Sequence, residues 1–381
     1  MAFEFITEAL AKQQSEGLLR QRQAVEFASA RTLTVAGKRY INFASNDYLG
    51  LAHHFDVAEL PELHSGSRSS ALVTGYLDIH QQLESRLCEL LGYQKALLFG
   101  SGFSANCSVI KTLFSPLSKG NNAAVFQDKL NHASLIDGSL AANAKLERFN
   151  HNDSNHLRAR LERSNARDKL IVTEGVFSMD GDAAPLTEIA AIAQQHQAWL
   201  MVDDAHGFGV VGDDGLGSTS TLTHKPEILI ITFGKAIGCQ GAAVLASEAV
   251  IDYMVQFNRE FIYTTALSPV LSAIALAQLE RLTQAQEQRQ RLSENIALFK
   301  SLAISAGLAL LPSDTAIQPV ILGSSDNVIT AQHALQARGF WVGAIRPPTV
   351  PQNTARLRIT LTAAHHRDDI RDLVATLQEV V

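Results

Sequence analysis

Four polar side chains lie in short motifs whose residue types and spacing could do chemistry. Lys235 lies in the stretch TFGKAIG, directly after an apolar run that is typical of a buried strand. Asp203 and His206 stand three residues apart in DDAHGFG, and His132 lies in LNHASLIDG. A partly buried lysine with small neighbours can form a Schiff base when nearby cations activate its amine. These motifs therefore indicate covalent catalysis through Lys235.

Two simpler interpretations of Lys235 compete with this one. Most lysines at strand ends are solvated and take no part in chemistry. A phosphate-loop lysine requires a glycine five residues before Gly234 and a serine or threonine after the lysine. Leu229 and Ala236 occupy those two positions, so a nucleoside triphosphate loop is excluded. The Schiff-base interpretation remains, and it makes demands on the rest of the chain.

A phosphate site and a carboxylate would meet those demands. The stretch GSGFSAN at residues 100–106 is a glycine-rich turn that leads into a predicted helix. Such turns present backbone N–H groups at the positive end of a helix dipole, where phosphate binds. Pyridoxal phosphate needs a phosphate site, a Schiff-base lysine and a carboxylate that keeps its pyridine nitrogen protonated. A planar imidazole can stack on its ring, so the sequence predicts this cofactor.

Taken singly, each of these residues has an ordinary explanation. His132 and His206 would more often be helix caps or surface residues, and the pair Asp203–Asp204 could form a simple turn. Their joint placement after successive predicted strands favours the functional interpretation for Lys235, Asp203, His206 and His132.

The elements that must position these side chains form a repeating pattern. Apolar runs of four or five residues alternate with helical segments, which is typical of a mostly parallel sheet covered on both faces. In such sheets, ligands bind beyond the carboxyl ends of the strands, where the polar motifs of this chain lie. The predicted strands of this sheet are Ala96–Phe99, Ala123–Phe126, Leu170–Thr173, Trp199–Val202, Ile228–Thr232 and Ala242–Leu245.

The two ends of the chain show different patterns. Apolar residues at helical spacing over 3–28 predict an N-terminal helix, and a hairpin follows around Gly37. A long helical stretch with a break runs from Ser268 to about Gly307. Strands near 317–322, 340–345 and 357–361 then alternate with helices at 326–338 and 366–380. We therefore predict an N-terminal arm (1–45), a large cofactor-binding domain (46–270) and a small C-terminal α/β domain (271–381).

The composition narrows the class of protein. The chain has 381 residues, of which 46% are apolar, and a formal net charge of -6. That charge argues against a nucleic-acid or membrane-surface partner. The three cysteines show neither metal-ligand spacing nor a disulfide pattern, and no run of 18 apolar residues occurs. We expect a cytoplasmic protein.

Five motifs carry a resemblance to a known family, the α-oxoamine synthases. These fold-type-I pyridoxal phosphate enzymes condense an amino acid with an acyl thioester and release CO2. The resemblance covers essentially the whole chain and implies an aspartate-aminotransferase-like α/β fold and a homodimer with shared active sites. The motifs are SNDYLGL (45–51), LNHASLIDG (130–138), EGVFSMDGD (174–182), DDAHGFG (203–209) and TFGKAIG (232–238).

The resemblance also implies a role for particular residues. Lys235 would carry the cofactor, Asp203 would pair with the pyridine nitrogen, His206 would bond the ring 3-oxygen and His132 would stack on the ring. These four are the implied catalytic residues. The implied cofactor-binding residues are Gly102, Phe103, His132, Ser178, Asp203, His206, Thr232 and Lys235, together with Thr264 or Thr265 of a partner subunit.

The substrates are implied in the same way. Asn46 and Arg358 match groups that hold the amino-acid carboxylate, and Arg20 and Thr349 match positions that face the acyl thioester. The stretch 344–365 is similar to the branch of the family that serves biotin synthesis. That branch implies L-alanine and a pimeloyl thioester, carried on coenzyme A or on a carrier protein. Glycine with acetyl-CoA is the alternative pair within the same chemistry.

Three further features bear on function. Arg68 and Ser69 stand where the family commonly has glycines. The string GDDGLG (212–217) lacks the order of a dinucleotide fingerprint, and a non-catalytic cofactor binder would not need Lys235 and Arg358. The pairs His53–His54 and His365–His366 lack further ligands, so we expect surface histidines and no metal site.

Overall fold

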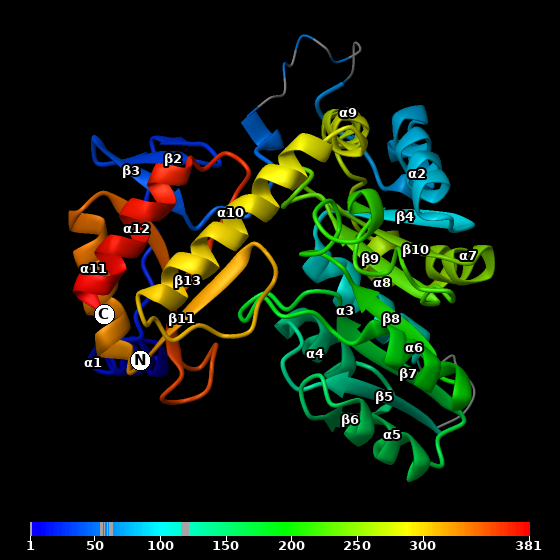
Figure 1. Ribbon diagram of the computed structural model, residues 1–381. Coiled ribbons are helices and arrows are strands. Elements are labelled where there is room, and N and C mark those ends of the chain that lie inside the picture. Colours follow the sequence, from blue (N-terminus) through cyan, green and yellow to red (C-terminus); the bar gives the residue numbers. More distant parts are fainter. Residues whose placement is uncertain (1, 54–55, 57, 59, 61–63, 116–121) are drawn as a thin grey trace. The chain divides into compact units, whose positions relative to one another are not determined.

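The computed structural model describes residues 2–53, 56, 58, 60, 64–115 and 122–381 (Figure 1). The chain divides into two compact units. The larger unit comprises Asn46–Ser178 and Asp182–Gln290, and the smaller comprises Met1–Ser45, Met179–Gly181 and Arg291–Val381. The chain therefore passes between the units on either side of the short stretch Met179–Gly181. The three domains predicted from the sequence stay a prediction.

The larger unit contains a seven-stranded sheet in the order β4-β10-β9-β8-β7-β5-β6. Neighbouring strands from β6 to β9 pair in parallel, whereas β10 pairs antiparallel with both β4 and β9. The predicted, mostly parallel sheet is thus confirmed. Its strands are β4 (Lys95–Phe99), β5 (Ala123–Asp128), β6 (Lys145–Phe149), β7 (Asp168–Glu174), β8 (Trp199–Asp203), β9 (Ile228–Thr232) and β10 (Ala242–Ala246).

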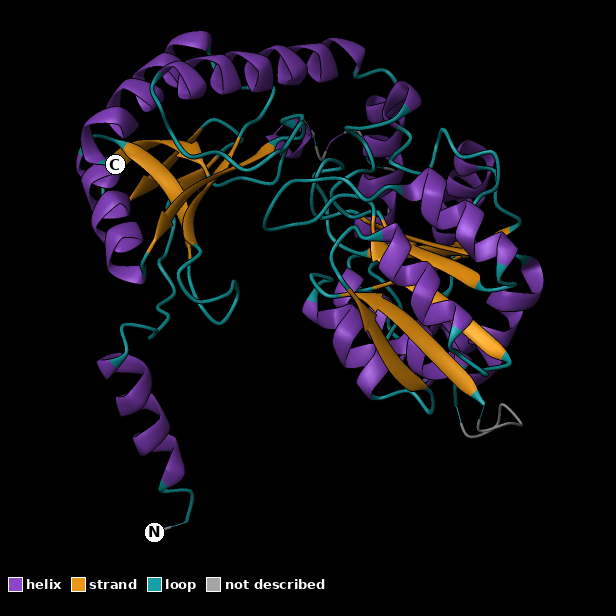
Figure 2. Cartoon of the chain, turned by 60° about the horizontal axis from the view of Figure 1, so that its bottom comes forward, coloured by secondary structure: helices purple, strands orange, loops and turns teal. Residues whose placement is uncertain are grey.

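Helices cover both faces of this sheet (Figure 2). Helices α3 (Gly102–Leu113), α4 (Ala133–Leu140) and α7 (Glu248–Phe257) share one apolar cluster with alternate strand residues. Helices α5 (Ser154–Glu162) and α6 (Leu186–Gln195) contact β5, β6 and β8 without joining that cluster. Each large side chain buried in such a core contributes about 1.5–3 kcal/mol to stability.

Further helices belong to the larger unit, and the last of them continues into the smaller unit from Arg291 onward. Helix α2 (Asp78–Leu91) ends at Gly92, whose φ of 67° is the left-handed conformation expected of a glycine stop. The predicted break in the long helical stretch is confirmed, because α9 (Pro269–Thr283) and α10 (Gln286–Ser305) are separate helices. The other short elements are Leu51–His53, Ala71–Gly75, Asp213–Gly215 and α8 (Arg259–Ile262).

The smaller unit contains a six-stranded sheet in the order β1-β2-β3-β12-β13-β11. The predicted hairpin around Gly37 forms, and its second strand β3 pairs in parallel with β12. The N-terminal hairpin is thus part of the same sheet as the C-terminal strands. The elements are α1 (Phe5–Ser15), β1 (Phe27–Ala28), β2 (Thr32–Val35), β3 (Lys38–Phe43), β11 (Ile317–Gly323), α11 (Ser325–Ala337), β12 (Phe340–Ile345), β13 (Ala355–Thr360) and α12 (Arg367–Val380).

The N-terminal helix is shorter than the apolar spacing predicts. Helix α1 ends at Ser15, and Gly17 turns the chain with a φ of 65°. Phe27 and Ala28 pair with β2 as a strand, so helical spacing over 3–28 was the wrong interpretation beyond Ser15. Among the described helices, none is long and apolar enough to cross a membrane.

Candidate active site

The polar motifs leave the larger sheet at one edge. Strands β5, β7, β8 and β9 are neighbours or near neighbours that run in parallel, and their last residues are Asp128, Glu174, Asp203 and Thr232. The segments that carry His132, Ser178, His206 and Lys235 follow directly. Because carboxyl ends of parallel strands meet at the same edge, the chain collects these side chains in one place.

Lys235 lies next to the start of helix α3. Its Nζ donates a hydrogen bond to Thr232 Oγ1 at 3.3 Å, and the side chain is half-buried. A Cβ on Gly102 would lie 2.5 Å from Thr232 Cγ2, so only glycine lets the helix approach this closely. The first N–H groups of a helix have no partner within it. A phosphate would therefore find free donors at Gly102 and Phe103, beside the Thr232 hydroxyl and the Lys235 amine.

A chain of hydrogen bonds connects Asp203 to His132. Asn106 Nδ2 donates to Asp203 Oδ2 at 2.6 Å and to Ser134 Oγ at 3.0 Å. Ser134 Oγ lies 2.7 Å from His132 Nδ1. Asn106, Ser134 and Asp203 are all buried, and the N–H of Ala205 donates to Asp203 Oδ1 at 3.0 Å. The structure thus joins the two residues expected at the edge and the face of the cofactor ring.

This chain of bonds fixes the tautomer of His132. The Ser134 N–H donates to His132 Nδ1 at 3.3 Å, so Nδ1 is an acceptor and a neutral ring carries its proton on Nε2. Burial lowers the pKa of His132, the charge of Asp203 opposes this shift and that of Lys235 adds to it. The Phe103 ring meets the His132 ring edge-on, with 6.2 Å between their centres. His132 is therefore a neutral Nε2–H donor.

The two neighbouring aspartates have different surroundings. Asp204 is fully buried, and its carboxylate accepts the N–H of Ser218 at 2.9 Å and the hydroxyl at 2.5 Å. A Cβ at Gly175, Gly207 or Gly217 would collide with this carboxylate, so three glycine backbones enclose it. Burial raises the pKa of Asp204 to about 7. Asp204 is therefore a structural residue.

Glu174 is a site residue that sequence reasoning missed. It ends β7, is 3% exposed, and its Oε1 accepts the backbone N–H of His132 at 2.6 Å. Burial raises the pKa of Glu174 well above the ordinary value, and the nearby charge of Asp203 raises it further. The signal was present, because Glu174 opens the motif EGVFSMDGD.

Tyr48 is a second residue that was missed, although it lies within SNDYLGL. Its hydroxyl is 2.6 Å from His206 Nδ1 and 3.4 Å from Asn46 Oδ1. A Cβ on Gly238 would lie 2.5 Å from the backbone nitrogen of Ala52, so this segment packs against the turn after Lys235. The structure thereby brings the predicted residues Asn46 and His206 together through Tyr48.

The other predicted residues of the larger unit are Ser178, Thr264 and Thr265. Ser178 is buried in the segment that follows β7. Thr264 and Thr265 are exposed, and Thr265 pairs with Ser70. Both threonines line a pocket that also includes Gly100, two residues before helix α3 begins. Their predicted role toward a partner subunit stays a prediction.

The predicted substrate residues Arg20, Thr349 and Arg358 belong to the smaller unit. Arg358 lies on β13, is 8% exposed and donates from Nη1 to Thr360 Oγ1 at 2.9 Å. Arg20 and Thr349 are exposed. Arg346 donates to the carbonyl of Gly17 and its own carbonyl accepts the N–H of Thr349 at 3.1 Å, so the segments of Arg20 and Thr349 are linked.

Arg68 and His365, which the sequence also set apart, have well-defined surroundings. Arg68 adopts a φ of 64°, which is the left-handed conformation that a glycine takes without strain. His365 is buried, its Nε2 lies 3.0 Å from the carbonyl of Asn42, and it stacks on Phe43, so it is not a surface histidine. His54 lies outside the described residues. Within the described chain, no group of three or more His, Cys, Asp or Glu residues could hold a metal ion.

Comparisons with known proteins agree with this architecture. The family model for aminotransferase class I and II matches residues 38–377. The 8-amino-7-oxononanoate synthase of Vibrio cholerae is 45% identical over 99% of this chain and 97% of its own, and that of Pectobacterium atrosepticum is 45% identical over 98% and 97%. Among solved structures, a serine palmitoyltransferase from S. paucimobilis with a bound PLP–myriocin adduct has a TM-score of 0.91 and 29% identity over 99% and 97% of the two chains. The 8-amino-7-oxononanoate synthase of Francisella tularensis has a TM-score of 0.75 and 32% identity over 89% and 97%.

These matches define a fold-type-I, pyridoxal-phosphate-dependent transferase, as the sequence predicted. The chain belongs to the aminotransferase class I and II family and, within it, to the 8-amino-7-oxononanoate synthases.

Proposed function

We propose that the protein condenses L-alanine with a pimeloyl thioester and releases 8-amino-7-oxononanoate, CO2 and the free thiol. The observation that carries this proposal is the 45% identity to named synthases over nearly the whole chain. The thioester would be carried on coenzyme A or on a carrier protein. Glycine with acetyl-CoA is the competing substrate pair within the same family chemistry.

The residues of the site fit pyridoxal phosphate. Gly102, Phe103 and Thr232 would hold the phosphate, and Lys235 would hold the aldehyde carbon through Nζ. When bound, the cofactor supplies an electron sink for the pair left on the substrate Cα after loss of a proton or of CO2. With its amine free, Lys235 Nζ would be the base that takes the Cα proton of the substrate.

The surrounding side chains would fix charge and orientation. Asp203 keeps its carboxylate as an acceptor through Asn106 and the Ala205 N–H, which suits a carboxylate that pairs with a protonated pyridine nitrogen. His206, held by Tyr48, would bond the ring 3-oxygen. His132 would stack on the ring and offer its Nε2–H to a substrate oxygen, because its Nδ1 is already occupied.

The substrates would bind through the remaining predicted residues. The planar guanidinium of Arg358 can hold a carboxylate in two parallel hydrogen bonds, with Asn46 as a second donor. Arg20 and Thr349 would face the acyl thioester. Alanine and glycine differ by one methyl group, which a pocket discriminates by roughly 1–3 kcal/mol, so slow use of glycine is expected.

A homodimer with shared sites is part of this proposal. Large apolar side chains stay exposed around the predicted partner-facing threonines: Val73 is 73% exposed, Tyr263 72% and Leu72 49%. Burial of such a patch by a second copy would place Thr264 or Thr265 of each subunit toward the partner's phosphate. A cytoplasmic location is proposed with it, because Cys88, Cys107 and Cys239 are all free thiols.

The first test is a pair of lysine variants. Purified protein should show the visible band of a lysine-bound cofactor, and Lys235→Ala should lose both that band and turnover. Lys145→Ala, at the exposed start of β6, should keep both. Borohydride reduction and peptide mapping that place the cofactor on another lysine would overturn the assignment of Lys235.

The substrates are tested by a product mass spectrum with each donor pair. The proposal expects 8-amino-7-oxononanoate from L-alanine with pimeloyl-CoA or pimeloyl carrier protein. Efficient turnover of glycine with acetyl-CoA, and none of alanine with either pimeloyl donor, would assign the competing activity while leaving the cofactor site intact.

A further inference from the structure

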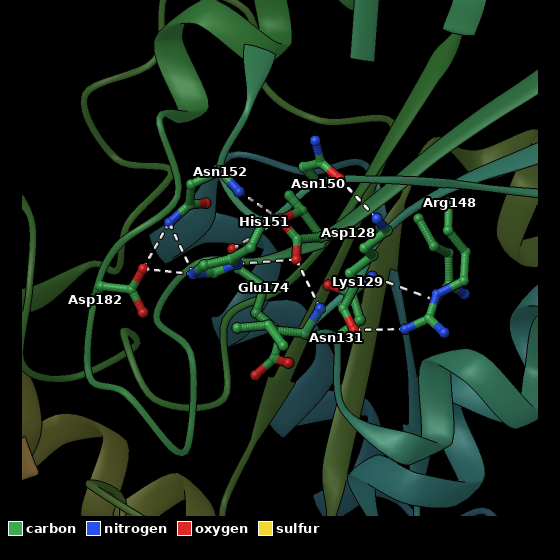
Figure 3. A network of polar contacts seen from close by, with 12 residues as sticks. Asp128, Lys129, Asn131, Arg148, Asn150, His151, Asn152, Glu174 and Asp182 are labelled. Atoms are coloured by element: carbon green, nitrogen blue, oxygen red, sulfur yellow. Dashed lines mark hydrogen bonds and ion pairs between the residues drawn. The ribbon is translucent and has the colours of Figure 1, made fainter. Parts of the chain in front are cut away.

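Figure 3 shows a second polar network, which contains His151, Asp128, Asn152 and Asp182. His151 follows strand β6 and lies between two carboxylates. Its Nδ1 is 2.9 Å from Asp128 Oδ1, and its Nε2 is 2.7 Å from Asp182 Oδ2. Of these three residues only Asp182 lies in a motif that predicted the cofactor site, and the function proposed above assigns a role to none of them.

The geometry makes His151 a cation. An ionised carboxylate can only accept hydrogen bonds, so each ring nitrogen must donate, and an imidazole that donates from both nitrogens is protonated. Burial by itself lowers the pKa of His151, but the hydrogen bonds to Asp128 and Asp182 outweigh it and raise the pKa to about 10. One positive charge thus holds two negative charges in place.

Asp128 connects this cation to the segment that carries His132. The carboxylate is fully buried at the end of β5. Its Oδ1 also accepts the N–H of Leu130 at 2.8 Å, and its Oδ2 accepts the N–H of Asn152 at 2.8 Å. The turn that follows leads directly to His132, the residue that caps helix α4. The position of the Asp128 carboxylate therefore sets where this turn begins.

Asp182 connects the cation to the segment that carries Ser178. Its backbone carbonyl accepts the N–H of Phe177 at 2.9 Å, and Val176 pairs with Ala183, so Asp182 closes a turn around Ser178. The Phe177 ring packs at right angles to the His151 ring, with 4.4 Å between their centres. Asn152 Nδ2 adds a bond of 2.7 Å to Asp182 Oδ2.

We propose that His151 is a positioning residue: with Asp128 and Asp182 it forms a charged clasp that holds the segments of His132 and Ser178 in one arrangement at the cofactor. The proposal rests on the proposed function, because that function places His132 and Ser178 against the ring. A misplacement of about 1 Å at such residues can cost roughly 10²-fold in rate.

The test compares His151→Gln with a matched control in purified holoenzyme. Glutamine keeps one donor but has no charge, so one carboxylate loses its partner. Leu161→Ala, a fully buried residue at the far end of helix α5, should destabilise the same unit by a cavity without touching the clasp. The measurements are kcat and KM for L-alanine, the circular dichroism of the bound cofactor, its dissociation constant and the melting temperature.

A positioning role predicts that His151→Gln lowers kcat by roughly 10- to 100-fold and changes the cofactor's circular dichroism, with a smaller change in KM. Leu161→Ala should lower only the melting temperature. A His151→Gln variant that melts earlier but keeps kcat and the cofactor signal would overturn the proposal.

A second measurement needs no variant. Nitrogen chemical shifts of wild-type protein labelled in histidine should show both nitrogens of His151 protonated at pH 8.5, and a neutral ring at that pH would overturn the proposal even if the variant fails to fold. Neither this spectrum nor the cofactor signal depends on the substrate. If wild-type protein fails to use alanine and pimeloyl donors, the proposed function fails while the clasp is still tested.

Discussion

Two histidines follow neighbouring strands of the same sheet, but one ring is neutral and the other is positively charged. His132 follows β5, and its Nδ1 accepts an N–H, so burial keeps the ring neutral. His151 follows β6, and both its nitrogens face carboxylates, so the ring stays charged although it is also partly buried. Position at a strand end therefore does not decide what a histidine does. The donors and acceptors around it decide: His132 accepts from Ser134, two residues away, whereas His151 lies between Asp128 and Asp182, 23 and 31 residues away.

A similar contrast applies to the adjacent carboxylates Asp203 and Asp204 at the end of β8. Asp203 accepts two donors and belongs to the chain of bonds that ends at His132, whereas Asp204 is enclosed by Ser218 and three glycine backbones. Asp203 is thus held by two donors that leave it an acceptor, whereas Asp204 serves the packing of the glycine backbones around it.

The largest expected effect tests this contrast between the aspartates. Asp203→Asn should lower turnover by roughly 10²–10³-fold, because an amide cannot keep the pyridine nitrogen protonated. Asp204→Asn should lower the melting temperature and leave turnover per folded molecule unchanged, since its carboxylate faces Ser218. Steady-state kinetics and thermal melts of both variants decide. Near-normal turnover in Asp203→Asn would show that Asp204, or no carboxylate at all, keeps the pyridine nitrogen protonated.

The next effect concerns the link between Asp203 and His132. Asn106→Ala removes the donor to the buried Asp203 carboxylate and the donor to Ser134. A hydrogen bond to a charged group contributes about 1.5–3 kcal/mol, so turnover should fall by roughly 10- to 100-fold. The absorption of the bound cofactor should also change its dependence on pH, because the carboxylate holds the ring nitrogen less firmly.

The matched control is Ser108→Ala, two residues after Asn106 on helix α3. The Ser108 hydroxyl contacts the carbonyl of Ala105 and the side chain of Asn258, and not Asp203 or Ser134. It should leave turnover and the absorption unchanged. If Asn106→Ala behaves like this control, the chain of bonds has no part in tuning the cofactor.

Much of the fold was predictable because its strands are apolar on both faces. Strands β8, β9 and β10 were predicted within one residue of their observed ends. Strand β6 was not predicted, because KLERF is an edge strand whose polar side chains stay partly exposed and break the apolar run. The N-terminal helix was predicted too long. Its apolar residues are exposed, so their helical spacing does not reflect packing against a core.

The site was predictable to a similar depth. The structure brings together Lys235, Thr232, Gly102, Asp203 and His132, each of which stands in a motif at a strand end or helix start. Their supporting partners were missed. Tyr48 and Asn106 lie 158 and 97 residues from His206 and Asp203, and side-chain contacts over such separations leave no periodic signal.

The smallest expected effect is a dependence of stability on pH that has opposite signs for the two histidines. The pKa of His151 is raised from 6.5 to about 10, so its contribution to stability is complete below pH 6.5 and disappears as the pH rises through 10. The pKa of His132 is lowered, so its contribution is present above pH 6.5 and is lost as the pH falls.

The charged groups that face His151 are Asp128 and Asp182, with Glu174 near Asp128. Because His151 is partly exposed, solvent screening keeps the amplitude small. Urea unfolding of wild type and His151→Gln between pH 6 and pH 10.5 measures it: the excess stability of the wild type should shrink steadily toward the upper end. A constant difference across that range would mean that His151 is neutral in the folded protein, and the contrast between the two histidines would disappear.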